Sequence, residues 1–264
     1  IEYEIGIHSE RVYDCEIFVT SPGVPSNSNV LKGAMQRGIQ IISELEFASR
    51  FCAGKIIAIT GTNGKTTCTS IVYHIFKEAG LKIKLAGNIG IAFSDVADSV
   101  DENEYVALEV SSFQLDYIDK FKPHVSIILN ITPDHLDRYE NRFQNYINSK
   151  LAIIKNQDKN DFYIFNYNDE ELQKVIKDLK MNSIPFSIDK NSIEGIYRYN
   201  REINFKNKLV CKESDLSLPG EHNLMNFMAA IAAAKVCGLD NKEICKAVCN
   251  FPGVEHRLEF VREY

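Results

Sequence analysis

A glycine-rich segment near residue 60 has the residue types and the spacing with the most definite chemistry. It consists of Gly61, Thr62, Asn63, Gly64, Lys65, Thr66 and Thr67, between the apolar run 55–60 and a helical pattern over 66–79. Glycines allow backbone N–H groups to turn toward an anion at the positive end of the helix dipole. Lys65 would reach the phosphate oxygens, and the Thr66 hydroxyl would bind Mg²⁺. The pattern predicts the phosphate loop of an ATP site.

The first glycine of the common phosphate-loop pattern is missing from this segment, because Ile59 stands five residues before Gly64. A glycine turn between a strand and a helix also occurs for packing alone, yet Gly-Lys-Thr after an apolar strand favours phosphate binding. No Asn-Lys-x-Asp segment for reading guanine is present, so ATP is favoured over GTP. A non-catalytic nucleotide-binding module would need only this loop and stays open as an alternative to an enzyme.

Three polar residues farther along the chain could complete such a site. Glu109 lies at the end of the predicted strand 105–110, so its carboxylate would lie at the carboxyl edge of the sheet, where a hard oxygen can hold Mg²⁺. His135 follows the run 125–130 and could offer a neutral imidazole nitrogen to a second metal ion. Taken alone, a strand-end glutamate is more often solvated, and Lys150, on a predicted helix, is read as an exposed lysine.

Several segments together resemble the Mur ligase family, and in particular its branch that adds D-glutamate. Mur ligases and folylpolyglutamate synthases share the Gly-Thr-x-Gly-Lys loop and activate a carboxylate as an acyl phosphate. The segments that match this branch, in its order and approximate spacing, are 21–25, 58–67, 87–90, 109–115 and 130–139. A folylpolyglutamate synthase or another Mur ligase is the alternative within the class, against which the segments 21–25 and 111–115 argue.

The resemblance implies roles for individual residues. Lys65, Glu109, His135 and Lys150 would be catalytic, and Thr66, Glu109, His135 and Lys150 would hold two Mg²⁺ ions. Lys150 would react with CO₂ to form a carbamate, which turns a cation into an anionic oxygen ligand. ATP would be bound by residues 61–67 together with Asn223, Asn226 and Arg257. Ser21, Gly23, Asn88, Ser111 and Gln114 would face the substrate.

The implied substrates are UDP-N-acetylmuramoyl-L-alanine and D-glutamate, joined in peptidoglycan synthesis by a monomeric cytoplasmic ligase. The 30 basic residues are scattered among 36 acidic ones, which disfavours a nucleic-acid partner. No apolar run approaches the roughly 20 residues of a membrane span. The seven cysteines contain no Cys-x-x-Cys pair, so a reducing cytoplasm is favoured over a disulfide framework or a zinc ribbon.

Alternating strand and helix patterns predict an α/β fold. We expect a mostly parallel central sheet flanked by helices, preceded by part of a Rossmann-like α/β domain. Strands are expected at 1–6, 17–20, 39–42, 55–60, 81–85, 105–110, 125–130 and 162–166, and hairpins within 195–210. Helices are expected at 30–37, 43–51, 66–79, 142–155, 170–179 and 222–237.

Three parts are expected along the chain. Residues 1–47 would be the end of an N-terminal domain that binds the UDP sugar, 48–250 the central ATP-binding domain, and 251–264 the start of a C-terminal domain. The chain begins at Ile1 within a strand pattern, so we expect its start to lie inside a domain. In the family the amino-acid pocket belongs mainly to the third domain. We therefore expect this chain to retain ATP contacts without completing ligation.

Overall fold

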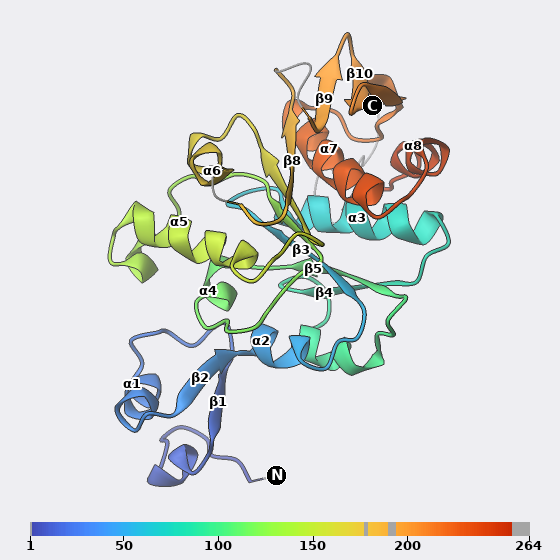
Figure 1. Ribbon diagram of the computed structural model, residues 1–264. Helices are drawn as coiled ribbons and strands as arrows, with labels where there is room; N and C mark the ends of the chain where they lie inside the picture. Colours follow the sequence, from blue (N-terminus) through green and yellow to red (C-terminus); the bar gives the residue numbers. More distant parts are fainter. Residues whose placement is uncertain (1, 177–178, 190–193, 255–264) are drawn as a thin grey trace, which may run out of the picture.

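The computed structural model describes residues 2–176, 179–189 and 194–254 and has the expected α/β architecture (Figure 1). Within these residues, the strands of the larger body form one nine-stranded sheet in the order β11-β10-β9-β8-β7-β6-β3-β5-β4. These strands are β3 Lys55–Thr60, β4 Ile83–Gly87, β5 Tyr105–Glu109, β6 Val125–Ile128, β7 Phe162–Asn166, β8 Asn182–Ser187, β9 Ile196–Tyr199, β10 Glu202–Phe205 and β11 Lys208–Lys212. Pairing is parallel from β4 through β9 and antiparallel from β9 to β11, which confirms the predicted mostly parallel sheet.

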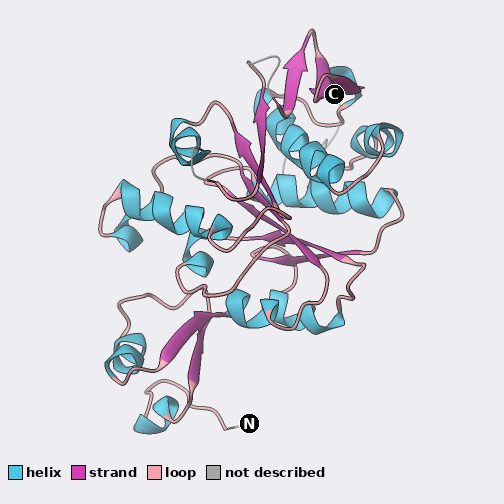
Figure 2. Cartoon of the chain, in the orientation of Figure 1, coloured by secondary structure: helices cyan, strands magenta, loops and turns pink. Residues whose placement is uncertain are grey.

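Helices cover both faces of this sheet (Figure 2). One face carries α3 Lys65–Glu78, α7 Glu221–Val236 and α8 Asn241–Cys249, which contact one another. The other carries α2 Glu44–Ser49, α4 Ser112–Leu115, α5 Phe143–Leu151 and α6 Glu170–Val175. Short 3₁₀ helices span Glu10–Tyr13 (η1), Phe93–Asp95 (η2), Ala97–Ser99 (η3), Leu136–Tyr139 (η4), Ala152–Ile154 (η5) and Glu213–Asp215 (η7).

Strand β3 lies inside the sheet, between β6 and β5, and its composition suits this position. Its residues from Ile56 to Thr60 are all buried, as expected of a parallel strand with helices on both faces. Helix α7 is buried along most of its length, and its alanines let it pack closely against α3. Since β3 leads directly into α3 through residues 61–64, the glycine-rich loop follows directly on a strand that is buried over its last five residues.

A smaller unit precedes this body. Strands β1 Ile17–Thr20 and β2 Gln40–Ser43 pair in parallel, with α1 Asn29–Gln36 between them. Helix α2 packs with the larger body: its Leu45 and Ala48 lie in that core, and Glu46 Oε2 accepts hydrogen bonds from the backbone N–H groups of residues 119–121 at 2.7–2.9 Å. The predicted boundary after residue 47 falls inside α2 and stays a prediction.

One predicted strand is absent from the described residues, and one strand of the sheet was not predicted. Residues 2–6 were predicted to be a strand, but they are not one, and none of the described strands pairs with them. Strand β8 was not foreseen, since Pro185 in its centre and the polar residues around it hide the strand pattern; it nevertheless pairs on both sides. Within the described parts of the chain, no helix is both long and apolar enough to cross a membrane.

Candidate functional site

The glycine-rich loop connects β3 to α3 and has a fixed backbone. Gly64 has φ 85°, and a Cβ at this position would overlap the side-chain oxygen of Asn226. Only glycine satisfies both conditions without strain. The first hydrogen bond of α3 runs from Cys68 N to Gly64 O at 2.9 Å, so the amides just before Cys68 form the open N-terminus of the helix. An anion is stabilised at this position by the helix dipole.

Two lysines donate to the same carbonyl group of this loop. Lys65 Nζ lies 3.0 Å from Gly61 O and 2.9 Å from Thr62 O, and Lys150 Nζ lies 2.9 Å from Gly61 O. Lys150 is only 2% exposed, and its ammonium stands 4.6 Å from the centre of the Tyr146 ring. The reading of Lys150 as an exposed lysine was therefore wrong, because α5 turns it inward onto the loop.

The surroundings of Lys150 favour its neutral form. Burial, and then the positive charge of Lys65, lower the pKa of Lys150 to about 7, whereas the charge of Asp134 acts in the opposite direction. Near neutral pH a large share of this amine therefore carries a free lone pair. Such an amine can attack an electrophile such as CO₂.

Glu109 ends β5, the strand that pairs with β3. Its side chain is 2% exposed, and Asn88 Nδ2 donates to its Oε1 at 2.9 Å. No hydrogen-bond partner reaches its Oε2 among the described residues. A buried carboxylate oxygen without a partner is costly unless a ligand or an ion satisfies it. A buried carboxylate oxygen of this kind fits a hard cation such as Mg²⁺.

The segment around Asn88 is built against Glu109. Gly87 has φ 103°, and a Cβ there would overlap the carbonyl oxygen of Glu109. The backbone N–H of Asn88 donates to that same oxygen at 2.9 Å. Asn88 therefore holds both the backbone and the side chain of Glu109.

His135 is less enclosed than Glu109 and Lys150. It precedes η4 with φ 48°, its side chain is 61% exposed, and its Nε2 lies 3.6 Å from Asp134 Oδ2. Among the residues that the structure describes, no three His, Cys, Asp or Glu side chains group closely enough to hold a metal ion. Bound metal would therefore need oxygens from other groups, such as the Thr66 hydroxyl, a carbamate or the phosphates.

Two cavities of about 370 and 320 Å³ flank the loop. Asn223 and Asn226, predicted to bind the nucleotide, both line the first cavity, and Asn226 also lines the second. The sequence reasoning missed His222, which lines both cavities, and Met225, which lines the second. His222 could have been found, because it adjoins Asn223 at the start of the same predicted helix.

Residues 59–234 match the Mur ligase middle domain. The chain belongs to the Mur ligase family. Its matched region contains the loop, Glu109, His135 and Lys150, so these features lie within the domain that defines the match.

Curated relatives of this Mur ligase are closely similar. It is 41% identical to the UDP-N-acetylmuramoylalanine–D-glutamate ligase of Chloroherpeton thalassium over 283 residues, and 41% identical to that of Bacteroides fragilis over 268 residues. Each match covers 99% of this chain and 60% of the relative. The chain thus spans about three fifths of the length of these relatives.

Solved structures of other Mur ligases share the fold. A UDP-N-acetylmuramate:L-alanyl-gamma-D-glutamyl-meso-diaminopimelate ligase from Neisseria meningitides superposes with a TM-score of 0.68 at 20% identity, covering 92% of this chain and 80% of that one. UDP-N-acetylmuramate–alanine ligase from Thermotoga maritima gives 0.59 at 22% identity, covering 90% and 55%. At these identities the likeness shows the fold alone.

The residues predicted to face the substrate of this Mur ligase lie in different surroundings. Ser21 and Gly23 are exposed in the loop between β1 and α1. Ser111 and Gln114 are buried and cap α4, with Ser111 N donating to Gln114 Oε1 at 2.8 Å. Ser111 and Gln114 are therefore hydrogen-bonded to each other at the start of α4. Arg257, predicted to contact the nucleotide, lies outside the described residues.

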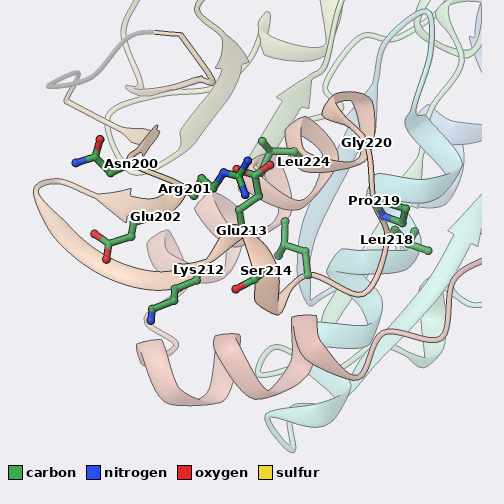
Figure 3. A pocket seen from close by; sticks show the side chains of 11 residues that line it. Asn200, Arg201, Glu202, Lys212, Glu213, Ser214, Leu218, Pro219, Gly220 and Leu224 are labelled. Carbon is green, nitrogen blue, oxygen red and sulfur yellow. The ribbon is translucent and has the colours of Figure 1, made fainter.

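A larger cavity of about 650 Å³ is lined by residues 200–202 and 212–214 and by the segment that precedes α7 (Figure 3). Arg201, Glu213 and Leu224 line it, and Leu218 borders both this cavity and the one at the loop. None of the residues with predicted chemistry lines it. The size of a cavity therefore does not locate the candidate site in this Mur ligase.

Proposed function

We propose that this chain is the nucleotide-binding core of an ATP-dependent ligase that joins D-glutamate to UDP-N-acetylmuramoyl-L-alanine in peptidoglycan synthesis in the cytoplasm. The names of the relatives that match nearly the whole chain support this substrate pair. We also propose that the protein is a monomer and that its three parts are divided after residues 47 and 250.

One observation carries the catalytic part of the proposal. Lys65 and Lys150 both donate to Gly61 O, and the adjacent strand ends at Glu109 with an unpartnered buried oxygen. A cationic lysine and a neutral-leaning amine thus meet at one carbonyl of the loop beside an open helix N-terminus, and a buried carboxylate ends the strand next to β3. A module that only binds nucleotide has no need for the buried lysine or the buried glutamate.

The reaction follows from these groups. Lys65 would leave its carbonyl partners for the phosphate oxygens, and the first amides of α3 would bind the same anion. An oxygen of the substrate carboxylate attacks the γ-phosphorus, and the bond to ADP breaks. The D-glutamate nitrogen then attacks the acyl carbon, phosphate leaves, and the nitrogen loses its proton. Positioning and charge stabilisation supply most of the acceleration in phosphoryl transfer.

Two Mg²⁺ ions belong to the proposal. Thr66, Glu109, His135 and a carbamate on Lys150 would hold them, and the ions would neutralise charge on the triphosphate. The carbamate forms when the Lys150 nitrogen bonds to the carbon of CO₂ and releases a proton. The remaining side chains complete the ligand contacts: Asn223, Asn226 and Arg257 for the nucleotide, and Ser21, Gly23, Asn88, Ser111 and Gln114 for the substrate.

Binding measurements on the chain test whether the site is a metal-dependent ligase core or only a phosphate loop. A non-hydrolysable ATP analogue is titrated with and without Mg²⁺. In the parent chain we expect Mg²⁺ to tighten binding, and Glu109→Gln should abolish much of that effect while Lys65→Ala weakens binding in both conditions. Glu78→Gln, an exposed acid on α3, is the matched control. Binding that is indifferent to Mg²⁺ and to Glu109→Gln would favour a plain nucleotide-binding module.

A further inference from the structure

The side chain of Asn130 extends the hydrogen-bond ladder between β3 and β6 beyond the ends of both strands. The backbone ladder continues with Leu129 N donating to Thr60 O and Thr62 N donating to Asn130 O, both at 3.0 Å. The next two bonds involve the carboxamide: Asn63 N donates to Asn130 Oδ1 at 2.9 Å, and Asn130 Nδ2 donates to Asn63 O at 3.1 Å. The amide side chain thus replaces a strand partner for Asn63.

The residues next to Asn130 are held as firmly. Thr132 N donates to Thr62 Oγ1 at 3.0 Å, and that hydroxyl donates to Thr132 O at the same distance. Ile131 N donates to a carboxylate oxygen of Asp169 at 2.7 Å. Three consecutive residues therefore anchor the segment that leads to His135, and two of them anchor it to the glycine-rich loop.

These bonds decide which loop amides remain for a phosphate. The N–H groups of Thr62 and Asn63 are both directed to Asn130. The donors left to face an anion are those at the start of α3, from Gly64 onward. Since a binding site gains affinity when its donors are already oriented, the residue that fixes Asn63 also fixes the direction of the amides that follow it.

We propose that Asn130 is a positioning residue for nucleotide binding. It fixes Asn63 through two hydrogen bonds, orients the amides at the start of α3 and joins the phosphate loop to the segment that carries His135. The proposal rests on the proposed function in one respect, namely that the loop binds ATP.

The first test measures the loop without nucleotide. Amide hydrogen exchange at Asn63 is compared in the parent chain, Asn130→Ala and the matched control Asn156→Ala. Asn156 Nδ2 also donates to two backbone carbonyls, those of Asp119 and Phe121 at 2.8 and 3.0 Å. Exchange at Asn63 should be about tenfold faster in Asn130→Ala, the factor that corresponds to a hydrogen bond of about 1.4 kcal/mol, and unchanged in Asn156→Ala.

Asn130→Asp covers the case in which Asn130→Ala fails to fold. The aspartate keeps an acceptor for Asn63 N but loses the donor to Asn63 O, so exchange at Asn63 should fall between that of the parent and that of the alanine variant. Exchange at Asn63 that stays at the parent rate in both variants would overturn the proposal.

The second test measures affinity for adenylyl imidodiphosphate with Mg²⁺. The dissociation constant should rise about tenfold in Asn130→Ala and by less than about twofold in Asn156→Ala, although both variants lose thermal stability. Equal affinities of the parent and Asn130→Ala would overturn the role of Asn130 and leave the proposed function standing. A parent chain that binds none of the analogue would instead contradict the proposed function.

Discussion

Asn88 donates from its side-chain nitrogen to Glu109 Oε1 and from its backbone nitrogen to Glu109 O, both at 2.9 Å. These two bonds fix the orientation of the Glu109 carboxylate. Its other oxygen, Oε2, has no hydrogen-bond partner among the described residues. Residues that orient a metal-binding side chain are usually needed nearly as much as the ligand itself. Asn88 therefore has a role toward Glu109 whether or not it also touches the substrate.

Replacing Asn88 should weaken the response to Mg²⁺. Because Asn88→Ala frees the Glu109 carboxylate to rotate, we expect the Mg²⁺ concentration needed for half-maximal binding of an ATP analogue to rise by about tenfold or more. Asn103→Ala, at an exposed position just before β5, should leave that concentration unchanged. An unchanged Mg²⁺ requirement in Asn88→Ala would show that the carboxylate does not depend on this bond.

The buried amine of Lys150 should make stability depend on pH. The pKa of Lys150 is about 7 in the folded chain, against the ordinary lysine value of 10.5 in the unfolded chain. Between these two pH values the unfolded chain therefore binds more protons than the folded one. The free energy of unfolding therefore gains a contribution that rises with pH from about 7 toward 10. Lys150→Met removes this contribution. Thermal melts in CO₂-free buffer should show a smaller pH-dependent rise for the variant, and parallel curves would contradict the assignment.

Two glycines that flank α3, Gly64 and Gly80, allow the effect of backbone strain to be measured separately from that of steric overlap. Gly64 and Gly80 have φ of 85° and 76°, but only at Gly64 would a Cβ overlap another residue, Asn226. Gly80→Ala should cost about 1–2 kcal/mol of unfolding free energy and leave nucleotide binding intact. Gly64→Ala should cost more and abolish binding of an ATP analogue. Nucleotide binding that survives in Gly64→Ala would show that the loop tolerates a different backbone.

Glu46 should link α2 to the larger body in a pH-dependent way. Burial alone would raise its pKa, but the hydrogen bonds from the backbone of residues 119–121 and from Arg50 outweigh burial, and the pKa is lowered. The stabilisation is present above the unfolded value near 4.5 and is lost as pH falls through the folded pKa. Glu46→Gln should cost about 1.5–3 kcal/mol at pH 7. In denaturant unfolding this difference should shrink in acid, and a constant difference would argue against a charged Glu46.

The sequence predicted two interior strands of the sheet with their correct bounds. Strands β3 and β7 have the predicted bounds because each is a continuous apolar run between polar or glycine-rich segments. Strand β8 was missed because Pro185 makes the local sequence unfavourable for a strand. The strand forms nevertheless, because it pairs with β7 and β9. Pairing between distant segments has no local signature, and the same reason explains the false strand at the start of the chain.

The site was predictable in its parts but not in its contacts. The spacing of the loop identified its backbone chemistry, whereas the burial of Lys150 depends on how α5 meets Gly61, 89 positions away. Likewise, nothing local to Asn88 indicates that Glu109 is its partner. A residue type and its spacing indicate what a group can do, and tertiary packing decides which neighbour it acts upon.

The most direct test of the proposed ligase is phosphate release from ATP by a protein that carries this chain, supplied with UDP-N-acetylmuramoyl-L-alanine. We expect phosphate release that depends on D-glutamate, is not supported by L-glutamate, and is lost in Lys65→Ala. Phosphate release that is indifferent to D-glutamate, or that persists in Lys65→Ala, would contradict it.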